Sequence, residues 1–138
     1  MAAFAGVGRE PPPRPFPRVP YAEAIARYGS DKPDLRFGLE IRDATELTRG
    51  SQFGVFASAA AVRYVVAPRA FSRAELARLE EIAKEWGAQG LAYLVRDESG
   101  EVRSPIAKFL SEEELAAFAG EPGTTTLFAA GDEDLVAR

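Results

Sequence analysis

The hydrophobic positions of the chain follow a helical period in some segments and a period of two in others. In residues 21–28, Ala24, Ile25 and Tyr28 fall on one helical face. Gly29 follows directly, at a position that favours the end of a helix. The pattern therefore predicts a short amphipathic helix over residues 21–28.

A longer helix is predicted to begin after Ser72. Residues 72–75 read SRAE, a capping box in which the side chains of Ser72 and Glu75 each bond the other's backbone N–H group. Gly87 is expected to end this helix. Its expected buried stripe consists of Leu76, Leu79, Ile82, Ala83 and Trp86.

A second capping box, SEEE at residues 111–114, predicts another helix that carries Leu115 and Phe118 and ends at Gly120. The three glutamates Glu112, Glu113 and Glu114 also suit the positive end of the helix dipole, so we interpret them as helix-start residues rather than a metal or general-acid site. Shorter helices are expected from Asp43 to about Leu47 and from residues 132–134 onward.

Runs of β-branched and aromatic residues predict strands. Residues 97–100 have turn chemistry, so the strands on either side of them are expected to form a hairpin. Trp86, Tyr93 and Phe109 lie on apolar periodicities and are expected in the core. The expected strands are residues 37–41, 53–56, 62–67, 91–95, a hairpin partner from Val102 onward, and 124–130.

Strands interleaved with helices indicate an α+β fold, with a mostly antiparallel sheet and two or three helices packed on one face. Residues 11–20 contain six prolines, which exclude a helix or a central strand. We therefore expect residues 1–20 to form a stiff proline-rich connector. Residues 21–138 then form one domain, in which residues 21–41, here called the lead-in segment, provide a helix and a loop.

The composition excludes several classes of enzyme site within this chain. The 138 residues include no cysteine and no histidine, so thiol nucleophiles, disulfides and serine–histidine triads are impossible. No apolar run approaches the roughly 18 residues that a membrane span needs, and the N-terminus lacks the features of a secretory signal. A cytoplasmic location with no membrane contact is expected.

The charge is −4 overall and uneven along the chain. Residues 1–50 carry 8 Lys and Arg against 7 Asp and Glu, whereas residues 51–138 carry 9 against 14. Neither part forms an evident electrostatic platform for nucleic acid. Any RNA contact is therefore expected to come from a local basic cluster and to be weak in isolation.

Five basic residues are candidates for RNA or partner contact. Lys32 and Arg36 lie in the charged loop SDKPDLR, residues 30–36, where they either approach a phosphate or belong to a structural network that pairs Asp31 or Asp34 with Arg27 or Arg36. Lys108 either reaches a phosphate or partner carboxylate or lies along the sheet surface. Arg14 and Arg18 flank Phe16, a spacing that suits RNA stacking or a clamp on a neighbouring domain.

Three blocks of sequence resemble one protein family. They are PFPRVPYAEAIARYGSDKPDLRFGLEI at 15–41, SRAELARLEEIAKEWGAQGLAYL at 72–94, and SPIAKFLSEEEL at 104–115 with TTTLFAAGDEDLVA downstream. The first block closely resembles bacterial-type aspartyl-tRNA synthetases just before their inserted domain. The other blocks resemble that inserted domain, the GAD domain, which the synthetases share with GatE-type amidotransferase subunits.

The resemblance implies a noncatalytic inserted domain that takes part in tRNA aspartylation by bounding or contacting the acceptor side of the tRNA. It implies an aspartate tRNA and the remainder of the synthetase as partners, and an amidotransferase as a further one. The family's catalytic motifs, which use ATP and Mg²⁺, lie outside this segment. We therefore expect no catalytic residue, cofactor or metal in this chain and no activity from it alone.

Two other functions compete with this reading. A protein-docking module, as in the amidotransferase subunits, would be favoured by an exposed apolar patch. A stand-alone enzyme would have to use a carboxylate pair, because histidine, cysteine and a nucleotide-binding loop are all absent from the sequence.

Overall fold

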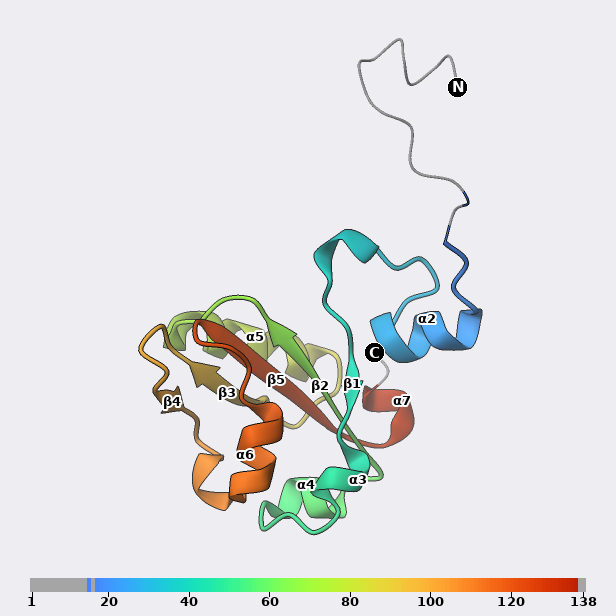
Figure 1. Ribbon diagram of the computed structural model, residues 1–138. Coiled ribbons are helices and arrows are strands. Elements are labelled where there is room, and N and C mark those ends of the chain that lie inside the picture. The colour runs from blue at the N-terminus through green and yellow to red at the C-terminus, as the bar shows by residue number, and fades with distance from the viewer. Residues whose placement is uncertain (1–14, 16, 137–138) are drawn as a thin grey trace.

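The computed structural model describes residues 15 and 17–136 of the chain (Figure 1). Residues 15 and 17–20 of the proline-rich stretch lie in neither a helix nor a strand. The elements that follow are α2 (Tyr21–Tyr28), η1 (Leu35–Phe37), β1 (Arg42–Asp43), α3 (Thr45–Thr48), α4 (Gly54–Ser58), β2 (Ala61–Ala67), α5 (Arg73–Glu85), β3 (Ala92–Arg96), β4 (Val102–Arg103), η2 (Ala107–Phe109), α6 (Glu112–Phe118), β5 (Thr124–Gly131) and α7 (Glu133–Val136).

Five strands form one antiparallel sheet in the order β1-β2-β5-β3-β4. The last long strand, β5, lies at the centre and pairs with β2 on one side and β3 on the other. Its Phe128 is opposite Tyr64 of β2 and Ala92 of β3. The α+β fold, the hairpin of β3 with β4 and the strands expected near residues 62–67, 91–95 and 124–130 are confirmed.

One face of the sheet carries the main hydrophobic core. The Phe128 ring lies 5.2 Å from the ring of Phe56 in α4 and 5.0 Å from that of Phe118 in α6, measured between centroids. These edge-on and tilted contacts bury the aromatic rings from three separate elements together. The buried cluster consists of Ala44, Phe56, Val62, Leu94, Ile106, Leu110, Phe118 and Phe128.

Two consecutive threonines of β5 form hydrogen bonds with segments that lie on opposite faces of the sheet. The Thr126 hydroxyl donates to the Phe118 carbonyl in α6 at 2.7 Å. The Thr125 hydroxyl donates to the Arg69 carbonyl at 2.9 Å and accepts from the Phe71 N–H at 2.9 Å, just before α5. Successive strand residues point to opposite faces. Helices therefore cover both faces, with α5 behind the sheet in Figure 1, and the expectation of helices on one face alone was wrong.

Both predicted capping boxes are confirmed. Ser72 and Glu75 cap α5, and Ser111 and Glu114 cap α6, each through reciprocal bonds between side chain and backbone. The predicted helix at 21–28 is also confirmed as α2, and Gly29 ends it in the left-handed conformation. The Asp43 carboxylate accepts from the Thr45 N–H at 2.8 Å where the short helix α3 begins.

Two predicted strands were wrong. Residues 37–41 contain no strand, because Phe37 ends η1 and Gly38 follows in the left-handed conformation, with a φ of +63° that is far from strand geometry. Residues 53–56 enter α4 instead. The spacing of Phe53 and Phe56 is that of neighbours on a helical face, and their rings meet edge-on with centroids 4.9 Å apart.

Part of the predicted core was also wrong. Trp86 is 63% exposed and Phe109 is 38% exposed, and Ile82 is exposed as well. On α5 only Leu76 is buried, since the helix lies against the sheet along a narrow stripe. The outer turns of α5 thus present apolar side chains to solvent.

The contrast between Phe128 and Trp86 gives a stability prediction. Phe128→Ala removes the ring at the centre of the aromatic cluster and is expected to lower the free energy of unfolding by about 3–5 kcal/mol. Trp86→Ala removes a larger but exposed ring and is expected to change it by less than about 0.5 kcal/mol. Urea unfolding followed by circular dichroism measures both, and similar losses would contradict this core.

Candidate interaction surface

Arg27 joins α2 to the chain that leads into β1. Its Nη2 lies 2.6 Å from Oε1 of Glu40, and its Nε donates to Oε2 of the same carboxylate at 3.3 Å. Its Nη1 also pairs with Glu23 one turn earlier in α2. The guanidinium therefore closes the base of the loop that runs from the end of α2 to Glu40.

The same junction is held by backbone and hydroxyl contacts. The Ile41 N–H donates to the Arg27 carbonyl at 2.7 Å, and the Tyr28 hydroxyl donates to Glu40 at 3.3 Å. The hydrogen bonds from Arg27 hold the pKa of Glu40 below its usual range, and Glu40 in turn raises the pKa of Arg27. The two ends of the loop are thus fixed to one another through charged and uncharged bonds.

Inside the loop, Asp34 holds Arg36. Asp34 Oδ1 accepts from the Arg36 N–H at 3.1 Å and from its Nε at 2.8 Å, so the carboxylate both caps η1 and forms an ion pair. These hydrogen bonds from Arg36, its side chain first, lower the pKa of Asp34 to about 2. The structural reading of the loop is confirmed for this pair, whereas Arg27 bonds glutamates instead of Asp31 or Asp34.

The predicted contact residues have different surroundings. Lys32 is exposed, and its backbone N–H donates to the Ser30 hydroxyl at 3.1 Å. No described carboxylate forms a salt bridge with its ammonium group. Arg18 is exposed just before α2. Arg14 lies outside the described residues.

Lys108 belongs to a different part of the domain. Its Nζ lies 4.8 Å from the centroid of the Phe109 ring, a cation–π contact within η2. Figure 1 shows η2 beside α6, away from the lead-in segment, which includes η1. The structure therefore places Lys32 and Arg36 in the lead-in segment and Arg18 just before it, and does not bring Lys108 to them.

The exposed apolar side chains of the lead-in segment were not predicted from the sequence. Tyr21 is 72% exposed and Phe37 is 70% exposed, and Leu35 and Leu39 are also exposed. Alternation of Phe37, Leu39 and Ile41 suggested burial, but Gly38 removes the strand geometry on which that argument depended. The glycine in the middle of the pattern was the available signal.

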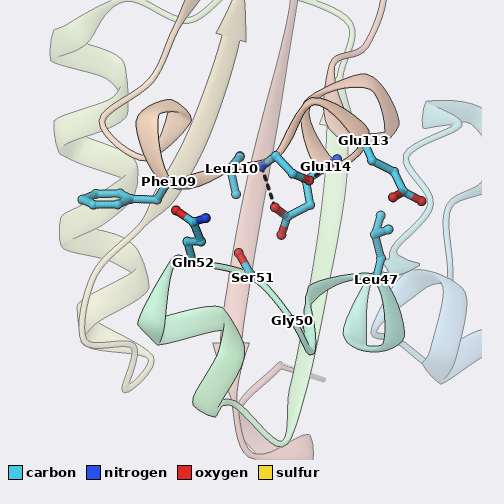
Figure 2. Close-up of a pocket in the computed structure, with 9 residues that line it drawn as sticks. Leu47, Gly50, Ser51, Gln52, Phe109, Leu110, Glu113 and Glu114 are labelled. Carbon is cyan, nitrogen blue, oxygen red and sulfur yellow. Dashed lines mark hydrogen bonds between the residues drawn. The ribbon is translucent and has the colours of Figure 1, made fainter.

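A pocket of about 320 Å³ also went unpredicted. It lies between the loop that joins α3 to α4 and the start of α6 (Figure 2). Glu113 and Glu114 line it, although their sequence pattern indicated only a helix cap. Neither this pocket nor the lead-in segment resembles a metal centre, since no cluster of three carboxylates capable of holding a metal occurs within residues 15 and 17–136.

No helix among the described residues has the length and apolar character needed to cross a membrane.

Comparison with known proteins gives two kinds of match. A family model for the GAD domain matches residues 54–138. The aspartate–tRNA(Asp/Asn) ligases of Natranaerobius thermophilus and Symbiobacterium thermophilum are 46% and 47% identical over 134 and 135 residues. The aspartate–tRNA ligase of Geobacillus kaustophilus is 46% identical over 136 residues.

These alignments cover 90 to 91% of the chain but 23% of each ligase. The chain thus spans about a quarter of the length of the curated relatives that it matches. The family match runs from the start of α4 to the end of the sequence, which is more than half of the chain. The chain therefore belongs to the GAD domain family.

Proposed function

We propose that this chain is a noncatalytic inserted domain of an aspartate–tRNA ligase and takes part in tRNA aspartylation. The observation that carries the proposal is the extent of the similarity. An alignment of 134 residues at 46% identity cannot be confined to residues 54–138, so it includes much of the region that precedes the GAD match. The lead-in segment is thus shared with the ligases together with the domain.

The geometry of the lead-in segment supports a role for it as the connection to the remainder of the ligase. Arg27 and Glu40 fix the base of its loop, while Tyr21 and Phe37 project into solvent. Burial of one such aromatic side chain is worth about 1.5–3 kcal/mol, so two of them form a useful contact for another domain. In this proposal the remainder of the ligase uses ATP and Mg²⁺. The present domain is held at a defined angle beside that remainder.

The proposal includes direct contact with the acceptor side of the tRNA. Lys32 in the lead-in segment and Arg18 just before it are exposed and suit phosphate oxygens. The net charge of −4 opposes RNA over the rest of the domain, so the affinity of the chain alone is expected to be low and strongly dependent on salt.

A second candidate function is a protein-docking module, like the GAD domain of GatE-type amidotransferase subunits. The exposed Ile82 of α5 and Trp86, the residue that caps the end of α5, favour it. Phe71 and Leu79 line a shallow apolar groove beside Ile82. Apolar side chains gathered on one helix are typical of a surface that contacts another protein.

Binding of the purified chain to an aspartate tRNA transcript tests the RNA contact. We expect fluorescence anisotropy to detect weak binding that falls steeply between about 50 and 200 mM salt. Lys32→Gln is expected to reduce the salt slope by about 1, because one phosphate contact is lost. Lys84→Gln is the matched control, since Lys84 lies on α5 and pairs with Glu80.

Absence of binding at 50 mM salt, or equal effects of the two lysine substitutions, would exclude the tRNA contact at Lys32. The docking function would then be the better account of the domain. An unrelated tRNA in parallel measures how much of the signal is nonspecific.

The ion pair within the loop gives a pH prediction. Asp34 is expected to titrate at about 2 in the folded chain, and Arg36→Gln to move its pKa back toward 3.8. Because the folded pKa is lowered, the pair stabilises η1 above about pH 4, and this contribution disappears as the pH falls through about 2. NMR titration of the Asp34 carboxyl carbon measures the shift, with Arg42→Gln as control. An unchanged Asp34 pKa in Arg36→Gln would contradict the pairing.

A further inference from the structure

The two capping boxes of this domain differ in the surroundings of their glutamates. In the box of α5, Glu75 Oε2 accepts from the Ser72 N–H at 2.9 Å and from its hydroxyl at 2.8 Å. The other oxygen, Oε1, accepts from the guanidinium of Arg69. Both oxygens of this carboxylate therefore have donors from the chain.

In the box of α6, only one oxygen has a donor. Glu114 Oε2 accepts from the Ser111 N–H at 2.7 Å, and the Glu114 N–H donates to the Ser111 hydroxyl at 3.1 Å. Glu114 is only 4% exposed, and its Oε1 is buried with no hydrogen-bond donor among the described residues. An acceptor left in this state is costly, and more so when it carries a charge.

This carboxylate lies at the wall of the 320 Å³ pocket. Figure 2 shows it directed toward the loop at Gly50 and Ser51, on the other side of the pocket. Leu47 and Phe109 also line the pocket and are 37% and 38% exposed, and Figure 2 shows them at opposite ends of it, so each offers apolar surface at one end. The volume lies at the lower end of the range for small-ligand sites, which is about 300–1,000 Å³.

The charges around the pocket favour a cation. Glu112 and Glu113 are exposed on the same helix turn as Glu114. The nearby basic groups already have partners, because Arg49 pairs with Glu46 and Lys108 lies over the Phe109 ring. A phosphate group would meet these carboxylates, so an RNA backbone is disfavoured here.

We propose that this pocket binds the guanidinium group of an arginine side chain from a partner polypeptide. Because Glu114 Oε1 has almost no accessible surface, the guanidinium reaches it by displacing the pocket wall that covers it, and then donates to it as that of Arg69 does to Glu75 Oε1 in the other capping box. Leu47 contacts the aliphatic part of the arginine side chain. This site is independent of the tRNA contact proposed at Lys32, and it defines a protein-recognition function for a separate part of the domain.

The probe for this site is N-acetyl-L-arginine amide, added to the ¹⁵N-labelled full chain. N-acetyl-L-citrulline amide is the matched control, since it keeps nearly the same shape without the charge. We expect saturable shifts of the Ser111 and Glu114 amide signals with the arginine compound, with a Kd on the order of millimolar for one ion pair on a small ligand. The citrulline compound is expected to bind at least about tenfold more weakly.

Two variants locate the binding. Glu114→Gln keeps an acceptor for the Ser111 N–H and replaces Oε1 by an amide donor, so the arginine response should be lost. Leu47→Lys places a cation at the pocket mouth without altering the cap and should also abolish the response. Glu75→Gln, in the box outside the pocket, should leave it unchanged.

Equal responses to the arginine and citrulline compounds would overturn the proposal. So would the absence of any saturable shift in the natural chain, or an undiminished response in folded Glu114→Gln and Leu47→Lys. The amide spectrum of each variant reports whether it is folded, and Leu47→Lys keeps the test decisive if the loss of Glu114 disturbs α6.

Discussion

The pairing of β5 with both β2 and β3 is the constraint on which the rest of this domain depends. It places Phe128 against aromatic rings from α4 and α6 on one face of the sheet. The same strand bonds α6 through Thr126 and the segment before α5 through Thr125, on opposite faces. One strand near the end of the sequence therefore sets the position of both helical layers, and with them the surfaces that are offered to partners.

The lead-in segment is attached to this framework through a small number of polar contacts. Arg27, Glu40 and the backbone bond of Ile41 hold its loop at the edge formed by β1, while its aromatic side chains stay exposed. Such exposed pairs contribute little to stability in water, so their main effect is to fix geometry. A segment held at its base and apolar on its outside suits the proposed role as a connection between the inserted domain and the rest of a ligase.

Much of this fold could be predicted from local patterns, because capping boxes and β-branched runs act over a few residues. The strand near Val62 and the helix after Ser72 are examples. The errors arose where the outcome depended on distant partners. Phe37 and Trp86 have apolar spacing, but no described element covers them. The Arg27–Glu40 pair joins residues 13 apart, and the sequence around Glu114 does not show whether a distant residue donates to its Oε1, so neither feature was visible in a local pattern.

The most direct test of the central claim is an aspartylation assay. It compares the isolated chain with a chimera, in which this chain replaces the matching segment of the Geobacillus kaustophilus ligase. Both are supplied with ATP, Mg²⁺, labelled aspartate and an aspartate tRNA. The account predicts that the chimera charges the tRNA and that the isolated chain does not. Charging by the isolated chain, or a folded chimera without activity, would contradict it.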